Sequence, residues 1–262
     1  MKLSPNVVML GVPDVDTARA FYSTAFSLAQ DGGGLLDVHG AGRIALVDRE
    51  TLAADAGVPS ATSGFRGYTL NYTVNQPGEV EAVLSAAEQC GATVVKPLKK
   101  SLFAGVSAVF RAPDGAIWKV AAPTRKDTGP VGQPPKPTET IAILGVDAPT
   151  ASRDFYSSLG MPVDRDYGNT FIDFQVTPGL CRMGLMTRKS LAKDAGVDAD
   201  GTGFQAVVFN HEVETRGEVD ILLAEAARAG GRVVVDAADH GQDAYAGQFA
   251  DPDGFLWRVC AG

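Results

Sequence analysis

Two basic residues, Lys119 and Arg258, occupy the same place in two copies of one short pattern. In each copy a Pro-Asp-Gly turn leads into a strand that carries a Trp followed directly by the basic residue. Pro suits position i+1 of a turn and Gly accepts positive φ, so the turns at 113–115 and 252–254 are tight. Successive strand side chains point to opposite faces, so each basic residue faces away from its Trp. With the Trp packed under helices, the cation either faces an interior and needs an anion there, or lies solvated at a rim.

The chain contains an internal duplication. The segment 52–58 recurs as 191–197, an offset of 139 (191 minus 52), and the same offset relates Trp118 to Trp257. Nearer the start, Leu10-Gly11-Val12 followed by Phe21-Tyr22 recurs as Leu144-Gly145-Val146 followed by Phe155-Tyr156, with an offset of 134 (145 minus 11). Several similar stretches in fixed order indicate a true repeat.

Each half divides into two units, in which a strand and a helix precede three short strands. In the first unit, a strand pattern at 6–12 is followed by a helical pattern at 14–26. In the second, a strand at 68–74 is followed by a helix that ends at Gly91. The Pro-rich stretch 123–137 has no hydrophobic period and is typical of an extended, semi-rigid linker. The sequence therefore predicts an α+β fold with a first domain at 1–122, a linker at 123–137 and a second domain at 138–262.

Composition excludes several classes of function. The net charge of −8 argues against nucleic-acid binding, which uses a basic face. No apolar run approaches the roughly 20 residues of a membrane span, and the first residues show no secretory signal. The 3 cysteines are widely spaced and odd in number, which fits a reducing compartment better than a disulfide framework. We therefore expect a cytoplasmic protein without nucleic-acid or membrane partners.

The unit order and the closing Asp-Pro-Asp-Gly-x-x-Trp pattern at 251–257, with Ala-Pro-Asp-Gly-x-x-Trp at 112–118, resemble the vicinal oxygen chelate superfamily. Its members include glyoxalase I, extradiol dioxygenases and binding proteins of the bleomycin-resistance type. The resemblance covers nearly the whole chain outside the linker and is most specific at 52–58, 64–74 and 113–120 with their copies. It implies that each half folds its two units into an eight-stranded sheet curled around a cup, with helices outside.

In that superfamily the cup holds a divalent metal, bound by His on the first strand of a unit and Glu on its last strand. Carried over, the His positions fall on Val7, Tyr72, Ile141 and His211, the Glu positions fall on Lys119 and Arg258, and Val47 and Met186 lie near the two remaining last-strand positions. Only His211 keeps a ligand type, and a guanidinium beside it does not bind a metal. We therefore expect no metal, and no motif indicates another cofactor.

The same carry-over places His211 and Tyr72 in the interior with the basic residues. There His211 is the one catalytic candidate, as a proton donor or acceptor, and Tyr72 is a hydrogen-bond donor to a ligand. The alternative is that both are hydrogen-bonded structural side chains. Aromatic residues before the closing turns either stack on a planar ligand or belong to the core. They are Phe103, Phe110, Tyr245 and Phe249.

Two hypotheses follow. In the first, the protein binds a hydrophobic, aromatic and partly anionic small molecule without a metal. The ligand-binding residues are then Lys119, Arg258, Tyr72, His211, Phe103 and Tyr245. In the second, the protein is an enzyme of secondary metabolism, of isomerase, lyase, cyclase or oxygenase type, that uses His211 and the basic residues. Because a tandem repeat supplies within one chain the pairing that single-domain relatives obtain by dimerising, we expect a monomer or weak homodimer.

Overall fold

The structure is a computed structural model that describes residues 2–100, 105–239 and 245–262. The helices are α1 (Val15–Ala25), α2 (Arg49–Asp55), α3 (Pro77–Gln89), α4 (Pro149–Ser158), α5 (Arg188–Ala195) and α6 (Arg216–Arg228). The strands of the first half are β1 (Val7–Val12), β2 (Ala29–Gln30), β3 (Leu36–Asp37), β4 (Arg43–Asp48), β5 (Thr62–Gly64), β6 (Tyr68–Thr73), β7 (Thr93–Lys100), β8 (Val106–Arg111) and β9 (Ile117–Ala122). Those of the second half are β10 (Glu139–Val146), β11 (Val163–Asp166), β12 (Ile172–Phe174), β13 (Arg182–Thr187), β14 (Gly201–Gly203), β15 (Val207–Val213), β16 (Arg232–Asp239), β17 (Tyr245–Ala250) and β18 (Leu256–Ala261).

All four predicted units are present. Units 1 to 4 begin with β1, β6, β10 and β15, and their long helices are α1, α3, α4 and α6. Two short helices were not predicted, α2 after unit 1 and α5 after unit 3. Each is started by a side-chain cap, because Asp48 accepts a hydrogen bond from the Thr51 amide at 2.9 Å and Thr187 accepts one from the Ser190 amide at 3.3 Å.

The strands form two eight-stranded sheets. Sheet 1 has the order β16-β17-β18-β15-β1-β4-β3-β2, sheet 2 has the order β11-β12-β13-β10-β6-β9-β8-β7, and β5 pairs with β14 separately. At the centre of each sheet the first strands of two units meet antiparallel, β1 with β15 and β6 with β10. Each first strand also pairs in parallel with the last strand of its own unit.

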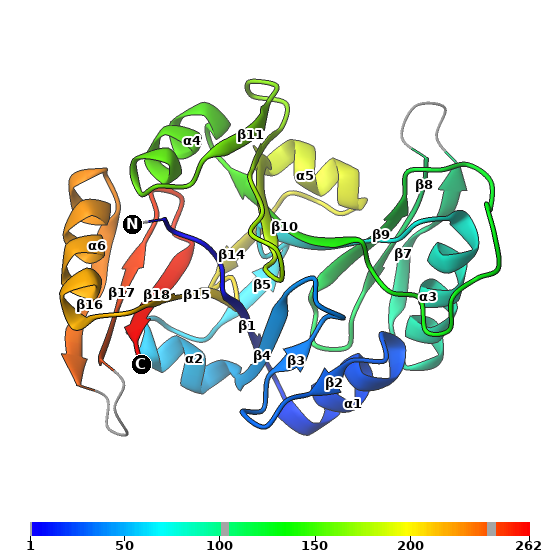
Figure 1. Ribbon diagram of the computed structural model, residues 1–262, viewed down its shortest axis with the longest axis horizontal. Helices are drawn as coiled ribbons and strands as arrows, with labels where there is room; N and C mark the ends of the chain where they lie inside the picture. Colours follow the sequence, from blue (N-terminus) through cyan, green and yellow to red (C-terminus); the bar gives the residue numbers. More distant parts are fainter. Residues whose placement is uncertain (1, 101–104, 240–244) are drawn as a thin grey trace.

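The sheets do not coincide with the halves of the chain. Sheet 1 joins unit 1 to unit 4, and sheet 2 joins unit 2 to unit 3 (Figure 1). The α+β class, with two curled eight-stranded sheets built from these units, is confirmed. The expectation that each half forms a sheet of its own is wrong. The four first strands carry similar apolar patterns, so the local sequence specifies a unit without specifying its partner.

The helices, by contrast, tie each half together. In the first half, the Tyr22 hydroxyl of α1 donates to the Asp114 carboxylate at 2.7 Å and accepts from the Trp118 indole at 3.2 Å, so α1 packs on unit 2. The second half repeats this arrangement with Tyr156 of α4, Asp251 and Trp257. In Figure 1, α3 accordingly lies beside β7 and β8, and α6 lies beside β16 and β17. The two halves thus interlock: the long helices hold each half together and the sheets join the halves.

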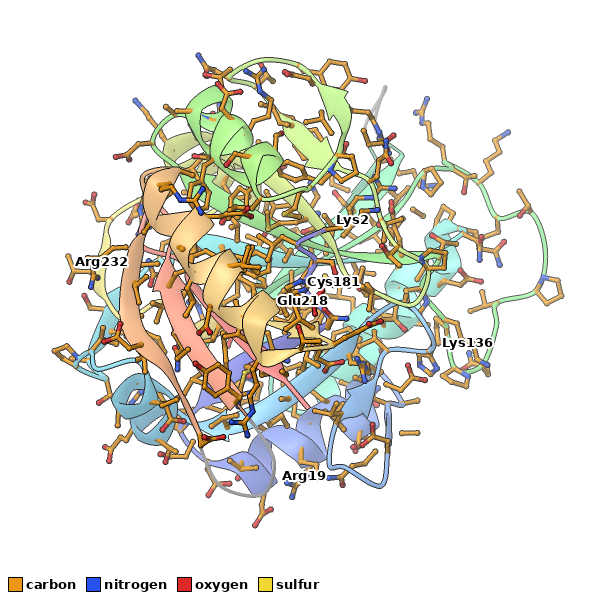
Figure 2. All side chains as sticks on the ribbon, turned by 60° about the vertical axis from the view of Figure 1, so that its left-hand side comes forward. Lys2, Arg19, Lys136, Cys181, Glu218 and Arg232 are labelled. Carbon is orange, nitrogen blue, oxygen red and sulfur yellow. The ribbon has the colours of Figure 1, made fainter. Side chains whose placement is uncertain are left out.

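The linker is fixed to unit 2 although it forms neither helix nor strand. The Gln76 side-chain oxygen accepts from the amides of Thr128 at 2.8 Å and Gly129 at 3.1 Å. Figure 2 shows charged side chains such as Arg19 and Lys136 at the periphery, whereas Cys181 lies toward the middle, where it is 6% exposed. None of the described helices is long and apolar enough to cross a membrane.

Candidate ligand site in the cup of sheet 1

Lys119 and Arg258 face away from their tryptophans, as predicted. Trp118 and Trp257 are 2% and 0% exposed within the main core beneath the long helices. We call the opposite face of each sheet its cup. In the cup of sheet 2, Lys119 lies beside Asn71 of β6. In the cup of sheet 1, Arg258 lies beside Asn210 of β15.

The two cups are built from equivalent positions of the repeat, with one difference on the third strand. Gln248 of β17 lies on the other side of Arg258, whereas its counterpart beside Lys119 is Val109 of β8. The cup of sheet 1 therefore carries an amide next to its cation, and the cup of sheet 2 carries an aliphatic side chain.

The short helices fill the apolar part of each cup. Leu52 and Ala53 of α2 pack against Val208 and Leu256 in sheet 1. In sheet 2, Leu191, Ala192 and Ala195 of α5 pack against another set of buried apolar residues. That set comprises Phe65, Val109, Ile117 and Ile143. Burial of these apolar faces is what holds α2 and α5 in place.

In sheet 2 the cation of the cup is already neutralised. The Lys119 ammonium lies 2.7 Å from the Asp194 carboxylate at the end of α5, with side chains that are 23% and 38% exposed. Lys96 also donates from its ammonium to the carbonyl oxygens of Lys193 and Asp194, at 2.7 and 2.6 Å. These bonds satisfy the C-terminal carbonyl groups of α5 and fix the helix over the cup.

In sheet 1 the cation is bound differently. Arg258 donates from Nη1 to the Asn210 side-chain oxygen at 3.1 Å, and no carboxylate among the described residues lies within ion-pair distance of it. The Gln248 amide nitrogen donates to the Asp55 carbonyl oxygen at 3.0 Å. Its Oε1 has no hydrogen-bond partner within the described chain, although Gln248 is only 7% exposed. A buried acceptor without a donor costs about 1–3 kcal/mol.

These groups line a cavity of about 220 Å³. Its lining residues are Asp55, Val235, Ala246, Gly247, Gln248 and Arg258. The wall thus combines the basic residue Arg258, the acidic residue Asp55, the amide residue Gln248 and a small apolar surface. This cavity is the candidate ligand site.

Tyr72 and His211 lie on the opposite face of the sheets and do not meet the basic residues. Tyr72 is fully buried, packs against Phe26 with ring centroids 5.0 Å apart, and donates to the Pro135 carbonyl oxygen at 2.8 Å. Burial raises the pKa of Tyr72. His211 Nδ1 lies 3.1 Å from both the Ser4 carbonyl oxygen and the Asn6 side-chain oxygen, and burial lowers the pKa of this imidazole. The expectation that both residues share the cup is wrong, because the carried-over position is one residue too late in β6 and β15.

The aromatic candidates that the structure describes do not line the cavity either. Phe110 and Phe249 are 0% exposed in the main core. Tyr245 packs on the helix side, where its hydroxyl donates to Asp220 at 2.9 Å and Arg216 lies over its ring. Phe103 lies outside the described residues. The aromatic side chains that were read as a stacking surface therefore belong, where described, to the packing under the helices.

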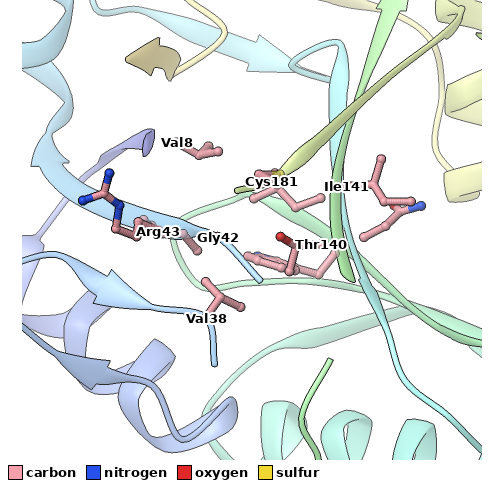
Figure 3. Close-up of a pocket in the computed structure, with 11 residues that line it drawn as sticks. Val8, Val38, Gly42, Arg43, Thr140, Ile141 and Cys181 are labelled. Carbon is pink, nitrogen blue, oxygen red and sulfur yellow. The ribbon is translucent and has the colours of Figure 1, made fainter. Parts of the chain in front are cut away.

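A second apolar cavity lies between the sheets but is too small for a ligand. Its volume is about 10 Å³, roughly the space of one water molecule. Figure 3 shows Val38 and Gly42 on one side of it and Thr140 and Cys181 on the other. The Thr140 hydroxyl donates to the Ala41 carbonyl oxygen across this boundary. The cavity is a packing gap where the two halves meet.

The side chains of the cups do not suit the divalent metal that the superfamily resemblance implies. The last-strand positions hold Lys119 and Arg258, and the neighbouring first-strand positions hold the neutral amides Asn71 and Asn210. Arginine keeps its charge at all accessible pH, so Arg258 repels a cation. Within the described parts of the chain, no three His, Cys, Asp or Glu side chains cluster as a metal site would require. The donor set therefore disagrees with metal chemistry of the superfamily type.

Comparison with solved structures supports the fold. Maize glyoxalase I has a TM-score of 0.65 at 16% identity, with 98% of this chain and 92% of that chain covered. A putative dioxygenase from Bacillus subtilis has a TM-score of 0.61 at 13% identity, covering 99% of this chain and 85% of that chain. These likenesses define the class, a tandem glyoxalase fold. No curated protein matches the chain.

The family model described as the Glyoxalase/Bleomycin resistance protein/Dioxygenase superfamily matches residues 140–259. Residues 140–259 therefore belong to this superfamily, and the resemblance recognised in the sequence is confirmed. The repeat extends the same unit pattern to the first half.

Sequence reasoning missed the neighbours of the basic residues. Asn210, Gln248 and Asp55 all contribute to the site, and only the first and last are matched in the other half, by Asn71 and Asp194. The available signal was the repeat itself, since the offset of 139 relates both pairs. Both halves keep an asparagine directly before Tyr72 or His211, namely Asn71 and Asn210. These asparagines indicate which face of the strand lines the cup.

Proposed function

We propose that the protein binds a small organic anion in the cup of sheet 1 and needs no metal to do so. The observation that supports this proposal is the cavity lined by Arg258, whose guanidinium has no carboxylate of the described residues within ion-pair distance. A guanidinium forms charge-assisted hydrogen bonds with carboxylate, enolate or phenolate oxygens. Asn210 uses one Arg258 donor, which leaves others for a ligand.

The site belongs to sheet 1 rather than sheet 2. In sheet 2, Asp194 already supplies the anion for Lys119, and α5 covers the cup. In sheet 1, the equivalent Asp55 lines the cavity without pairing with Arg258. An external anion therefore completes a pair in sheet 1, whereas it would have to displace one in sheet 2.

The cavity favours a compact ligand. Its volume of about 220 Å³ is below the roughly 300–1,000 Å³ typical of sites for drug-sized molecules. Its apolar wall consists of Val235, Ala246 and Gly247, so an aliphatic group fits it better than a stacked ring. Catalysis by His211 is not part of this proposal, because His211 faces the other side of sheet 1.

We further propose that the protein is a monomer in a reducing compartment. The first strands of all four units already pair within one chain, so no second copy is needed to finish either sheet. Cys90, Cys181 and Cys260 form no disulfide. Sedimentation velocity at increasing concentration tests the monomer, which a stable dimer at micromolar concentration contradicts.

Titration calorimetry with carboxylates from acetate to benzoate tests the site. Loss of one charge-assisted contact, worth about 1.5–3 kcal/mol, weakens binding by roughly tenfold or more in Arg258→Met. Lys119→Met is the matched control from the other cup and keeps the wild-type affinity. Equal affinity in Arg258→Met and wild type, or a loss in Lys119→Met alone, contradicts the assignment to sheet 1.

Metal analysis tests the second part of the proposal. The protein is purified without chelator and its nickel, zinc and iron contents are measured against protein concentration. We expect less than stoichiometric metal. One equivalent that resists dialysis contradicts metal independence.

A further inference from the structure

We infer that the ligand is a compact zwitterion of the amino acid class, with an ammonium group close to its carboxylate. The inference rests on the proposed function and adds the second charge of the ligand. It starts from Asp55, which lines the same cavity as Arg258 but is not within ion-pair distance of it. A ligand that carries only negative charge meets Arg258 favourably and Asp55 unfavourably. A zwitterion meets both residues with the opposite charge.

The equivalent acidic and basic residues form an ion pair in the cup of sheet 2 but not in the cup of sheet 1. The equivalent carboxylate, Asp194, lies 2.7 Å from Lys119, so the repeat is able to bring the two positions into contact. In sheet 1 the same pair of positions instead stands on the wall of a cavity of about 220 Å³. In the cup of sheet 1, unlike that of sheet 2, the acidic and the basic residue both line a cavity without forming an ion pair.

Gln248 connects Asp55 to the strand that carries the cavity wall. Its amide nitrogen donates to the Asp55 carbonyl oxygen at 3.0 Å, which sets the amide orientation and leaves Oε1 as the unpartnered atom. A flipped amide would place two oxygens against each other, so the hydrogen-bond network excludes it. An ammonium group has three donors and no acceptor, which suits a carboxylate such as that of Asp55.

The remaining wall limits the side chain of such a ligand. Val235 and Ala246 supply the apolar surface, and no aromatic residue lines the described cavity. An aliphatic amino acid of small or medium size therefore matches the cavity in charge, hydrogen bonding and shape.

The test is titration calorimetry on the full-length chain with a series of amino acids from glycine to L-phenylalanine. Each is paired with the carboxylic acid that lacks only its amino group, for example L-valine with 3-methylbutanoate. L-Valinamide is included because it lacks the carboxylate. We expect the best amino acid to bind roughly tenfold or more tightly than its deaminated partner and its amide, which corresponds to about 1.4 kcal/mol for each missing contact.

Two variants and one control variant distinguish this inference from the proposed function on which it rests. Asp55→Asn weakens the amino acid by roughly tenfold and does not weaken the deaminated acid, while Asp194→Asn, its counterpart in sheet 2, changes neither. Arg258→Met weakens both carboxylates. If deaminated acids bind as well as amino acids and depend on Arg258, the zwitterion inference is overturned and anion binding stands. If no probe depends on Arg258, both fail.

Discussion

The Tyr156–Asp251–Trp257 triad offers the sharpest test of the interlocked architecture, because one hydroxyl group connects a helix to the closing turn of unit 4. The Tyr156 hydroxyl donates to Asp251 at 2.6 Å and accepts from the Trp257 indole at 3.3 Å. Asp251 also accepts from the amides of Asp253 and Phe255, at 3.0 and 2.7 Å. Burial raises the pKa of Asp251 from 3.8 to about 7, and the hydrogen bond from Tyr156 opposes that rise.

The raised pKa makes stability depend on pH in a defined direction. The folded state holds the Asp251 proton more tightly than the unfolded state, so this contribution to stability is complete below about pH 4. It is then lost as the pH rises toward about 7, with a slope near 1.4 kcal/mol per pH unit. Above pH 7 the buried Asp251 carboxylate is charged, so the stability of the fold depends most on the hydrogen bonds that this carboxylate accepts.

Replacing Tyr156 with Phe removes one donor and leaves the Trp257 N–H unpaired. At pH 8 the lost bond to a charged acceptor is worth about 1.5–3 kcal/mol, and the unpaired indole adds about 1 kcal/mol. At pH 5.5 Asp251 is protonated in the folded state, so the lost bond is a neutral one worth about 1 kcal/mol. We therefore expect Tyr156→Phe to destabilise the protein by about 3 kcal/mol at pH 8 and by about 2 kcal/mol at pH 5.5.

Urea unfolding followed by circular dichroism at both pH values measures the difference. Tyr22→Phe, the counterpart in the first half, removes the equivalent hydrogen bond to Asp114, whose pKa is also raised by burial. Tyr167→Phe serves as the control, since Tyr167 is 63% exposed and its hydroxyl has no role in the core. An equal cost of Tyr156→Phe at both pH values refutes the reasoning, because Asp251 would then not change its protonation in this range.

Three further predictions concern the cups and the pairing of the halves. Leu191→Ala removes a 0% exposed side chain with which α5 packs into the cup, and we expect a loss of about 2–5 kcal/mol in urea unfolding; a loss below about 1 kcal/mol contradicts the packing of this helix in the cup. Lys119→Met breaks a partly exposed ion pair and lowers stability by about 1 kcal/mol or less in the same assay, so a much larger loss means that the pair is better shielded than its exposure indicates. Fragments 1–137 and 138–262 each leave two first strands without their partners. Light scattering on each fragment alone should therefore show self-association, and mixing the two fragments should give one heterodimer. Two stable monomers that do not combine would contradict the shared sheets.

Much of the architecture follows from local sequence. The turn at 252–254 and the alternation of Trp257 with Arg258 determine that the basic residue faces away from the core, because side chains alternate along a strand whatever its partner is. The repeat likewise predicts four similar units, since the same periodicities recur at a constant offset. These features depend on contacts within a few residues of one another.

Only the tertiary structure decided which units share a sheet and what each cup contains. The strand β1 pairs with β15 from the far end of the chain, and nothing in its own pattern distinguishes that partner from β6 or β10. The same limit applies to the cups. Lys119 is neutralised by Asp194 and Arg258 is not neutralised by Asp55, although both pairs occupy equivalent positions of the repeat. Whether two such side chains touch depends on how a helix packs over a sheet, and that packing is set by the whole core.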